Sequence, residues 1–332
     1  MRRIVLAAAM IALLGEGVAA AAPRGAPSTL RVARAADHAH RAGLAEWWTL
    51  RFVRPAPHGW LEVRAYRESN SRGLDVIGGD GKSEGVSERL AAPQLVATAT
   101  SLVAGGPDGR LQVRRGGRRI VLTGRVQGRL RLTGVRRGVT ATGWRLGEAV
   151  RYPAARWRPV TLSWSMLVAT ATVRGTLTLP GGRRLRLDGW RASYEHGWGN
   201  ILREDGAWRY WDQAIVHRRG GRAWIVYGLN RSDTVTGPGA RDAQWLGLLA
   251  RVGPHGIRVC RPRVHRSGWH YLFPEIARWA TRMRLRCGGM ALRLRDGPFG
   301  IAEYQSHIEV LSRTVAGRDR IGFAMHLGHA GQ

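Results

Sequence analysis

The chain has 332 residues, of which 44% are hydrophobic, and this composition supports a buried core and excludes an intrinsically disordered protein. The chain is strongly basic, because its 53 Lys and Arg residues outnumber its 23 Asp and Glu residues. Lys82 is the only lysine, so nearly all of the positive charge comes from arginine. Arginine binds phosphate groups, so this excess raises the prospect of a nucleic-acid or anionic-membrane partner. The arginines are nevertheless scattered over alternate positions, as codon bias of a GC-rich genome would leave them, and nucleic acid is the least favoured partner.

The N-terminus has the pattern of a secretory signal peptide over residues 1–22. A basic M-R-R is followed by the apolar run Ile4–Leu14 and by small residues near Ala20–Ala22. The run is shorter than the ~20 apolar residues of a spanning helix. We therefore expect an exported protein, secreted or periplasmic, whose residues 23–43 form an N-terminal linker.

From Leu44 onward, apolar and polar residues alternate in many short segments that Gly-rich turns separate. This pattern is typical of antiparallel barrels or sandwiches. Only two stretches have a helical spacing of apolar residues, at 35–44 and 274–283. The sequence predicts an all-β protein with few short helices.

The best candidate for a domain boundary is R-Y-P-A-A-R-W-R-P at 151–159, where two prolines interrupt the alternation. It divides the chain into a first β-domain over 44–155 and a second β-domain over 156–332. The chain also contains 14 tryptophans. As a set, they favour a roomy, aromatic-lined interior that binds a small molecule, although any single one is more often plain core.

The tract Y-E-H-G-W-G from Tyr194 to Gly199 is the main candidate for a site. If the tract is a strand, Tyr194, His196 and Trp198 share one face, and Glu195 lies on the other. A desolvated imidazole between two rings suits a general acid or base. The alternative is a core histidine that a backbone carbonyl satisfies.

A second aromatic tract follows as a predicted hairpin of 208–216 and 222–231. It carries Trp211, Asp212 and Tyr227. A carboxylate in such a strand is costly unless it is paired, so Asp212 either pairs with an arginine or serves the function.

The remaining candidates concern cysteine, metal and membrane binding. Cys260 and Cys287 form either a disulfide or two buried thiols. The pairs His38/His40 and His326/His329 are weak metal candidates, and we expect neither a metal nor another cofactor. The predicted helix after Pro274 carries arginines and either rests on an anionic membrane or caps a barrel end.

Two motifs resemble a known family. E-W-W-T-L at Glu46–Leu50 resembles the opening motif of AttH-type two-domain lipocalin-like proteins, a group that includes the carotenoid 1,2-hydratases (hydroxyneurosporene synthases). The stretch Trp190–Gly199 resembles the motif of their second domain, and His196 and Trp198 match the family's site residues. Glu195 and Gly197 stand where the family has Asp and Asn, and Leu229 stands where it has a second carboxylate.

The resemblance implies two consecutive lipocalin-like barrels that bind a hydrophobic isoprenoid or lipid. Acid-assisted hydration, cyclisation or isomerisation would be the chemistry, which in the hydratase is a hydro-lyase reaction; the alternative is a non-catalytic lipid carrier or cell-envelope binding protein. Contact with an anionic membrane or an envelope polymer remains open. The candidate catalytic residues are His196 with Glu195 as its electrostatic partner, and the candidate ligand-binding residues are Tyr194, Trp198, Trp211, Asp212, Tyr227, Trp47 and Trp48.

Overall fold

The structure is a computed structural model that describes most of the chain after the predicted signal peptide. The described residues are 27–43, 45–54, 59–68, 71–79, 86–151, 157–200, 208–231, 245–272, 277–296, 300–303, 308–315 and 321–328. The segment 1–22 and His329 lie outside these ranges, and the side chains of Trp211, Leu229 and His326 are also outside the description.

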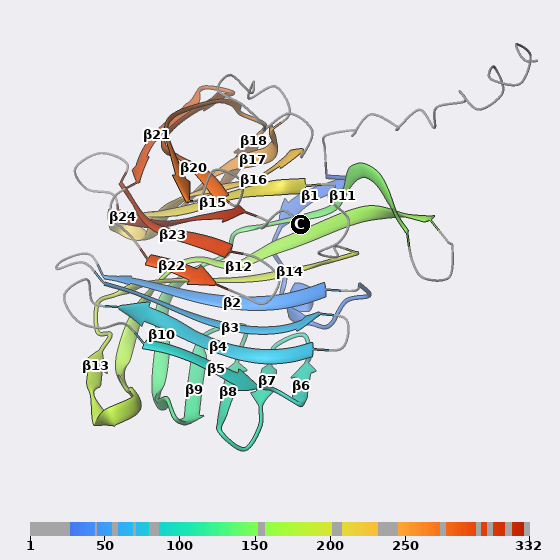
Figure 1. Cartoon of the computed structure of the whole chain (residues 1–332). Helices are drawn as coiled ribbons and strands as arrows, with labels where there is room; N and C mark the ends of the chain where they lie inside the picture. The colour runs from blue at the N-terminus through green and yellow to red at the C-terminus, as the bar shows by residue number, and fades with distance from the viewer. Residues whose placement is uncertain are drawn as a thin grey trace, which may run out of the picture.

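The first sheet holds the N-terminal part of the chain (Figure 1). Within the described residues it has 14 antiparallel strands. Their main order in space is β5 (Val86–Ala91), β4 (Ser71–Gly79), β3 (Gly59–Glu68), β2 (Ala45–Arg54), β14 (Arg191–Gly199), β12 (Trp157–Thr178), β10 (Gln127–Arg136), β9 (Arg119–Gly124), β8 (Gly109–Arg114), β7 (Leu102–Gly105) and β6 (Gln94–Ala97). Off this path, β11 (Val139–Arg151) pairs with β1 (Thr29–Val32) and β12, and β13 (Arg184–Arg186) pairs with β12.

The second sheet holds the C-terminal part and curls on the opposite side of β12 and β14 (Figure 1). The described residues give it ten strands. Their order is β18 (Gly256–Cys260), β17 (Trp245–Gly253), β16 (Arg222–Arg231), β15 (Trp208–Arg218), β24 (Ile321–Gly328), β23 (Ile308–Val315), β21 (Met290–Asp296), β20 (Ala277–Cys287) and β19 (Arg263–Leu272), with β22 (Gly300–Glu303) beside β23.

The predicted all-β, lipocalin-like fold class is confirmed by these two curled antiparallel sheets. The described helical structure consists of the 3-10 turns η1 (Ala35–His38), η2 (Pro180–Gly182) and η4 (Arg219–Gly221). No helix in the described ranges has the length and apolar character that crossing a bilayer requires.

The division between the sheets differs from the predicted domain boundary at 155/156. Strands β11 and β12, on either side of the proline-containing segment, pair with each other in the first sheet. The chain changes sheets only between Gly199 and Trp208, so the Tyr194–Gly199 strand belongs to the first sheet. Proline lacks the N–H of a ladder hydrogen bond, but Pro159 still lies in β12 opposite Ala149, so a proline does not distinguish a strand end or hairpin from a domain linker.

The predicted linker over 23–43 and the two predicted helices also differ from the structure. Strand β1 and turn η1 lie in the predicted linker, and η1 is a single 3-10 turn. The stretch after Pro274 forms β20, where Met283 and Leu285 are buried and Arg282 and Arg284 are exposed. A period of two therefore governs it, and the membrane-resting helix is wrong.

Three apolar layers hold the sheets together. One fills the concave side of the first sheet, around residues such as Trp48 and Leu50. The second lies between the sheets and includes Trp164 and Tyr227. The third, with Met283 and Leu285, fills the second sheet. Because β12 and β14 have buried residues on both faces, every side chain of the Tyr194–Gly199 tract faces packed protein on one side of the sheet or the other.

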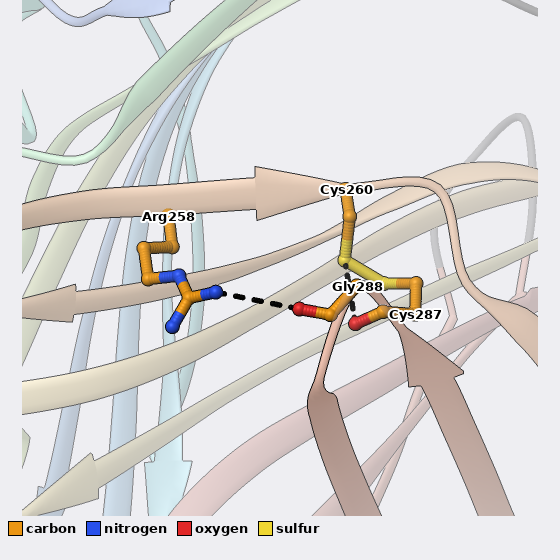
Figure 2. Close-up of a disulfide and its surroundings, with 4 residues drawn as sticks. All are labelled: Arg258, Cys260, Cys287 and Gly288. Carbon is orange, nitrogen blue, oxygen red and sulfur yellow. Dashed lines mark hydrogen bonds between the residues drawn. A yellow bond between two sulfur atoms is a disulfide. The ribbon is translucent and has the colours of Figure 1, made fainter.

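Of the two alternatives for Cys260 and Cys287, the structure has the disulfide. It joins the end of β18 to the end of β20, beside a hydrogen bond from Arg258 Nη2 to the Gly288 carbonyl at 3.4 Å (Figure 2). Since β18 and β19 are the two ends of the sheet's main path, the bond fastens one end of the sheet close to the other.

Replacing Cys260 and Cys287 by serine is expected to lower the free energy of unfolding by about 2–4 kcal/mol, because the crosslink restricts a long loop of the unfolded chain. Urea unfolding with and without a thiol reductant measures the effect. The reductant should destabilise the natural protein and leave the double-serine variant unchanged. Equal stability of the oxidised and reduced natural protein would show that the crosslink contributes nothing.

Candidate functional site

His196 lies at the centre of a buried polar cluster on the inner face of the first sheet. Its Nε2 is 2.8 Å from Glu46 Oε1, and its Nδ1 contacts the backbone carbonyl oxygen of Asp37. Both partners are hydrogen-bond acceptors. The ring satisfies both only as an imidazolium, which donates from each nitrogen.

Glu46 is the hub of this cluster and is fully buried. It accepts hydrogen bonds from His196, from His40 Nδ1 at 2.9 Å, from Arg67 Nε at 2.8 Å and from the Arg41 backbone N–H at 2.8 Å. Burial, the largest influence, raises the pKa of Glu46, but the hydrogen bonds and charge of His196 and the bonds of His40 and Arg41 hold it below its usual value. Glu46 is therefore a carboxylate, which accepts in each of these hydrogen bonds.

The aromatic rings and cations of the cluster form one column. Arg41 lies over Trp198 at 5.7 Å, and Trp198 lies 4.7 Å from His196. His196 stacks on Trp48 at 4.7 Å with an interplanar angle of 6°, and Trp48 meets His40 edge-on at 5.2 Å. A guanidinium and two imidazole rings thus alternate with indole rings, whose faces stabilise positive charge.

The column reaches the surface at one end of β2, β3 and β14. The side chains of His40 and Arg67 are each 33% exposed, whereas His196 and Glu46 are not exposed. Trp198 is half-buried. A hydrogen-bonded path therefore runs from His40 at the surface through Glu46 to the buried His196.

Turn η1 is fixed so that its backbone faces His196. The Asp37 carboxylate accepts from Arg31 Nη1 at 2.7 Å, the Arg34 N–H at 2.7 Å and Thr140 Oγ1 at 2.8 Å. These bonds orient the Asp37 carbonyl towards the ring. The segment that the sequence assigned to a linker is therefore part of the cluster.

His38, next in the turn, is a neutral histidine. Its Nδ1 donates to the Thr98 carbonyl at 3.0 Å, and its Nε2 accepts from the Tyr194 hydroxyl at 2.7 Å. Burial, together with the charge of His196, lowers the pKa of His38 to about 4. Burial also raises the pKa of Tyr194, which keeps its hydroxyl a donor. Tyr194 is thus a fully buried anchor for η1.

Glu195 is not the partner of His196. The predicted alternation is confirmed, and it turns Glu195 towards the layer between the sheets. There Glu195 pairs with Arg51 Nη1 at 2.8 Å and accepts from Trp164 Nε1 at 2.9 Å and from Gln213 Nε2 of the second sheet. This carboxylate fastens the two sheets to each other, and Glu46 takes the electrostatic role that the sequence gave to Glu195.

Asp212 and Tyr227 lie away from His196. Asp212 accepts from Arg266 Nη1 at 3.1 Å and Trp245 Nε1 at 3.2 Å, which confirms the arginine pairing among its two alternatives. Tyr227 stacks between Trp164 at 4.2 Å and Trp144 at 5.3 Å. Both residues belong to the second sheet, and only Tyr227 faces the layer between the sheets.

The predicted roomy aromatic interior is filled with packed rings. Trp48, Tyr194 and Tyr227 have no exposed surface. Trp47 is half-buried and covers Gly197, where a Cβ atom would come within 2.2 Å of the indole. At position 197, only glycine leaves room for this ring. Of the predicted ligand-binding residues, Trp198 and Trp47 retain exposed surface, and the side chain of Trp211 is not described.

The sequence analysis missed Glu46, His40, Arg41 and Arg67 as members of the cluster. Glu46 opens the E-W-W-T-L motif, which is the one signal that could have marked it. In the described part of the chain, no three His, Cys, Asp or Glu side chains could hold a metal ion. His196 and His40 bind different oxygens of Glu46, so they do not converge on one point.

Solved structures share this fold over most of the chain. An AttH protein of Nitrosomonas europaea matches with a TM-score of 0.61 and 12% identity, covering 89% of this chain and 95% of its own. CghA matches with a TM-score of 0.52 and 12% identity over 87% and 89% of the two chains. CghA with Sch210972 matches with a TM-score of 0.53 and 12% identity over 92% and 99%. No protein-family profile and no curated protein sequence matches the chain. The likeness at 12% identity establishes the AttH-like, lipocalin-like fold.

Proposed function

We propose that the protein binds a hydrophobic molecule of the isoprenoid or lipid class where the His40–Glu46–His196 path reaches the surface. Supporting this location, half-buried Trp198 and the apolar inner face of the first sheet meet the cluster there. A neighbour in fold, CghA, was solved with Sch210972. The proposal includes export through the segment 1–22.

The observation that carries a reactive role is the position of His40. His196 has both ring nitrogens committed to Glu46 and Asp37, and it is fully buried. His40 binds Glu46 through Nδ1 alone, and its side chain is partly exposed. It is therefore the histidine of the cluster that can contact a bound ligand. His196 then acts as a positioning residue that fixes Glu46 and its charge.

The reaction we propose is acid-assisted isomerisation, cyclisation or hydration. A proton leaves His40, the alkene π pair forms the new C–H bond, and the adjacent carbon becomes positive beside an indole face. Loss of a neighbouring C–H proton to His40 completes an isomerisation. In a cyclisation, the π pair of a second alkene first forms a C–C bond to the positive carbon, and the new cation then loses a neighbouring proton to His40. Addition of water, which returns its proton to His40, completes a hydration. An imidazolium is a weak acid for an isolated alkene, so conjugated or strained substrates suit this site best.

A carrier without chemistry is the second candidate. The full burial of His196 and the lowered pKa of Glu46 favour it, because the cluster then contains no carboxylic acid that could donate a strong proton. In this case the column would hold the turn η1 and the rim of the sheet in place for binding.

Incubation of the purified protein with the conjugated isoprenoid β-farnesene in D₂O, followed by mass spectrometry of an organic extract, separates these functions. Proton transfer to carbon adds deuterium to the recovered hydrocarbon or its product, and His40→Ala should abolish the label. His265→Ala, which removes another exposed histidine on β19, is the matched control. Stoichiometric β-farnesene without label identifies a carrier. Absence of both binding and label for β-farnesene and for a membrane-lipid extract would contradict the proposed ligand class.

A further inference from the structure

Arginines gather on the outer face of β19, β20 and β21, although they are scattered in the sequence. The outward positions of these strands carry Arg263, His265 and Ser267 on β19, Arg282, Arg284 and Arg286 on β20, and Arg293 and Arg295 on β21. All six arginines are exposed. We call this set of six arginines with His265 the arginine face.

The strand register places these like charges directly beside one another. Arg263 is opposite Arg286, Arg284 is opposite Arg293, and Arg282 is opposite Arg295. Like charges in directly opposite positions destabilise a sheet. With strands ~4.8 Å apart and a rise of ~3.3 Å per residue, the six guanidinium stems share an area of about 10 Å by about 13 Å.

The inward arginine of the same strands shows the contrast. Arg266 on β19 points into the second sheet, is 8% exposed and donates to Asp212 at 3.1 Å. None of the six outward arginines has an ion pair with a described residue. The buried arginine therefore has a carboxylate partner within the chain. The charge of the arginine face is not compensated by a described carboxylate, so it can bind an external anion.

We propose that the arginine face binds a linear, phosphate-bearing polymer that lacks nucleobases. Guanidinium groups match phosphate in a bidentate manner, and a ladder of them suits a chain of phosphates better than one ion. Among the described side chains, no outward position of the face carries Trp, Tyr or Phe, on which bases would stack. None of these described outward positions carries a large apolar side chain, as insertion into a lipid surface would require. The face lies on the convex side of a curled sheet (Figure 1), which also favours a flexible chain over a flat bilayer.

The test uses inorganic polyphosphate as the probe and the full-length mature protein. The variant Arg282→Gln/Arg284→Gln/Arg293→Gln should weaken binding at least about tenfold, and the slope of log K against log salt should fall by about 2. The control Arg114→Gln/Arg184→Gln/Arg222→Gln removes the same charge from exposed positions elsewhere and should change affinity by less than about twofold. All six positions are exposed, so both variants should unfold in urea as the natural protein does.

Three results would overturn the assignment. Equal weakening by the two triple variants would show that only the net charge acts. Tighter binding to vesicles of anionic phospholipid than to polyphosphate of equal phosphate content would assign the face to a membrane. Tighter binding to single-stranded DNA at equal phosphate content would assign it to nucleic acid.

Discussion

Replacing Glu46 by glutamine is expected to lower the free energy of unfolding by about 3–5 kcal/mol, because it leaves the buried His196 and its neighbouring cations without their anion. Glu46 accepts four hydrogen bonds and has no exposed surface, so no solvent replaces the lost charge. Urea unfolding followed by tryptophan fluorescence measures the change.

Glu88→Gln is the matched control for this substitution. Glu88 pairs with Arg125 at 3.5 Å, and the side chain of Arg125 is 58% exposed. An exposed pair contributes about 0–1 kcal/mol, so the control should stay within that range. Adding His196→Gln to Glu46→Gln should cost less than the sum of the two single changes, because the unpaired cation is then gone. Additive losses would contradict the ion pair.

Acidification from pH 6.5 towards pH 5 is expected to destabilise the protein with a slope that approaches about 2.7 kcal/mol per pH unit, which is the limit of two protons at about 1.36 kcal/mol each. Burial lowers the pKa of His38 to about 4 and that of His217 to about 3, from the ordinary value of 6.5. His38 is enclosed by Tyr194, Thr98 and His196, and His217 by Thr170 and Arg191.

The direction follows from which state binds the protons. Below pH 6.5 the unfolded chain protonates both histidines while the folded chain keeps them neutral, so the contribution of these two histidines to stability is complete above pH 6.5 and falls with the pH. The pKa values of Asp37 and Glu46 are lowered from 3.8 and 4.5, so these carboxylates lose their contribution only at lower pH. Urea unfolding between about pH 7 and about pH 5 therefore isolates the histidines.

Two variants identify the histidines responsible for this slope. His217→Gln should reduce it by about half, to about 1.4 kcal/mol per pH unit, and His265→Gln, an exposed control, should leave it unchanged. Stability that does not vary between about pH 6.5 and about pH 5 would contradict the neutral, buried state of His38 and His217.

Alternation within single strands made part of this structure predictable. The faces of Tyr194, His196 and Glu195 follow from a period of two, and so does the all-β fold class. The pairing of Asp212 with an arginine follows from the cost of a buried charge. Each of these inferences needs only the local sequence and the physical chemistry of one side chain.

The remaining features could not be predicted, because they depend on which strands pair and in which register. Glu46 reaches His196 because β2 and β14 pair with Trp48 opposite His196, and nothing near residue 196 encodes that register. The arginine face likewise depends on the pairing of three strands, each of which shows only alternate arginines by itself. Residues 274–283 fit both a helical and a strand period, and burial of Met283 and Leu285 decided between them.

The most direct test of the site is ¹⁵N NMR of the histidine rings, which distinguishes an imidazolium from a neutral ring. In the natural protein at neutral pH, His196 should give the signals of a ring protonated at both nitrogens. Glu46→Gln should change those signals, and Glu195→Gln should leave them unchanged. If His196 is a neutral ring, or if Glu195→Gln changes its signals and Glu46→Gln does not, the His40–Glu46–His196 path is wrong.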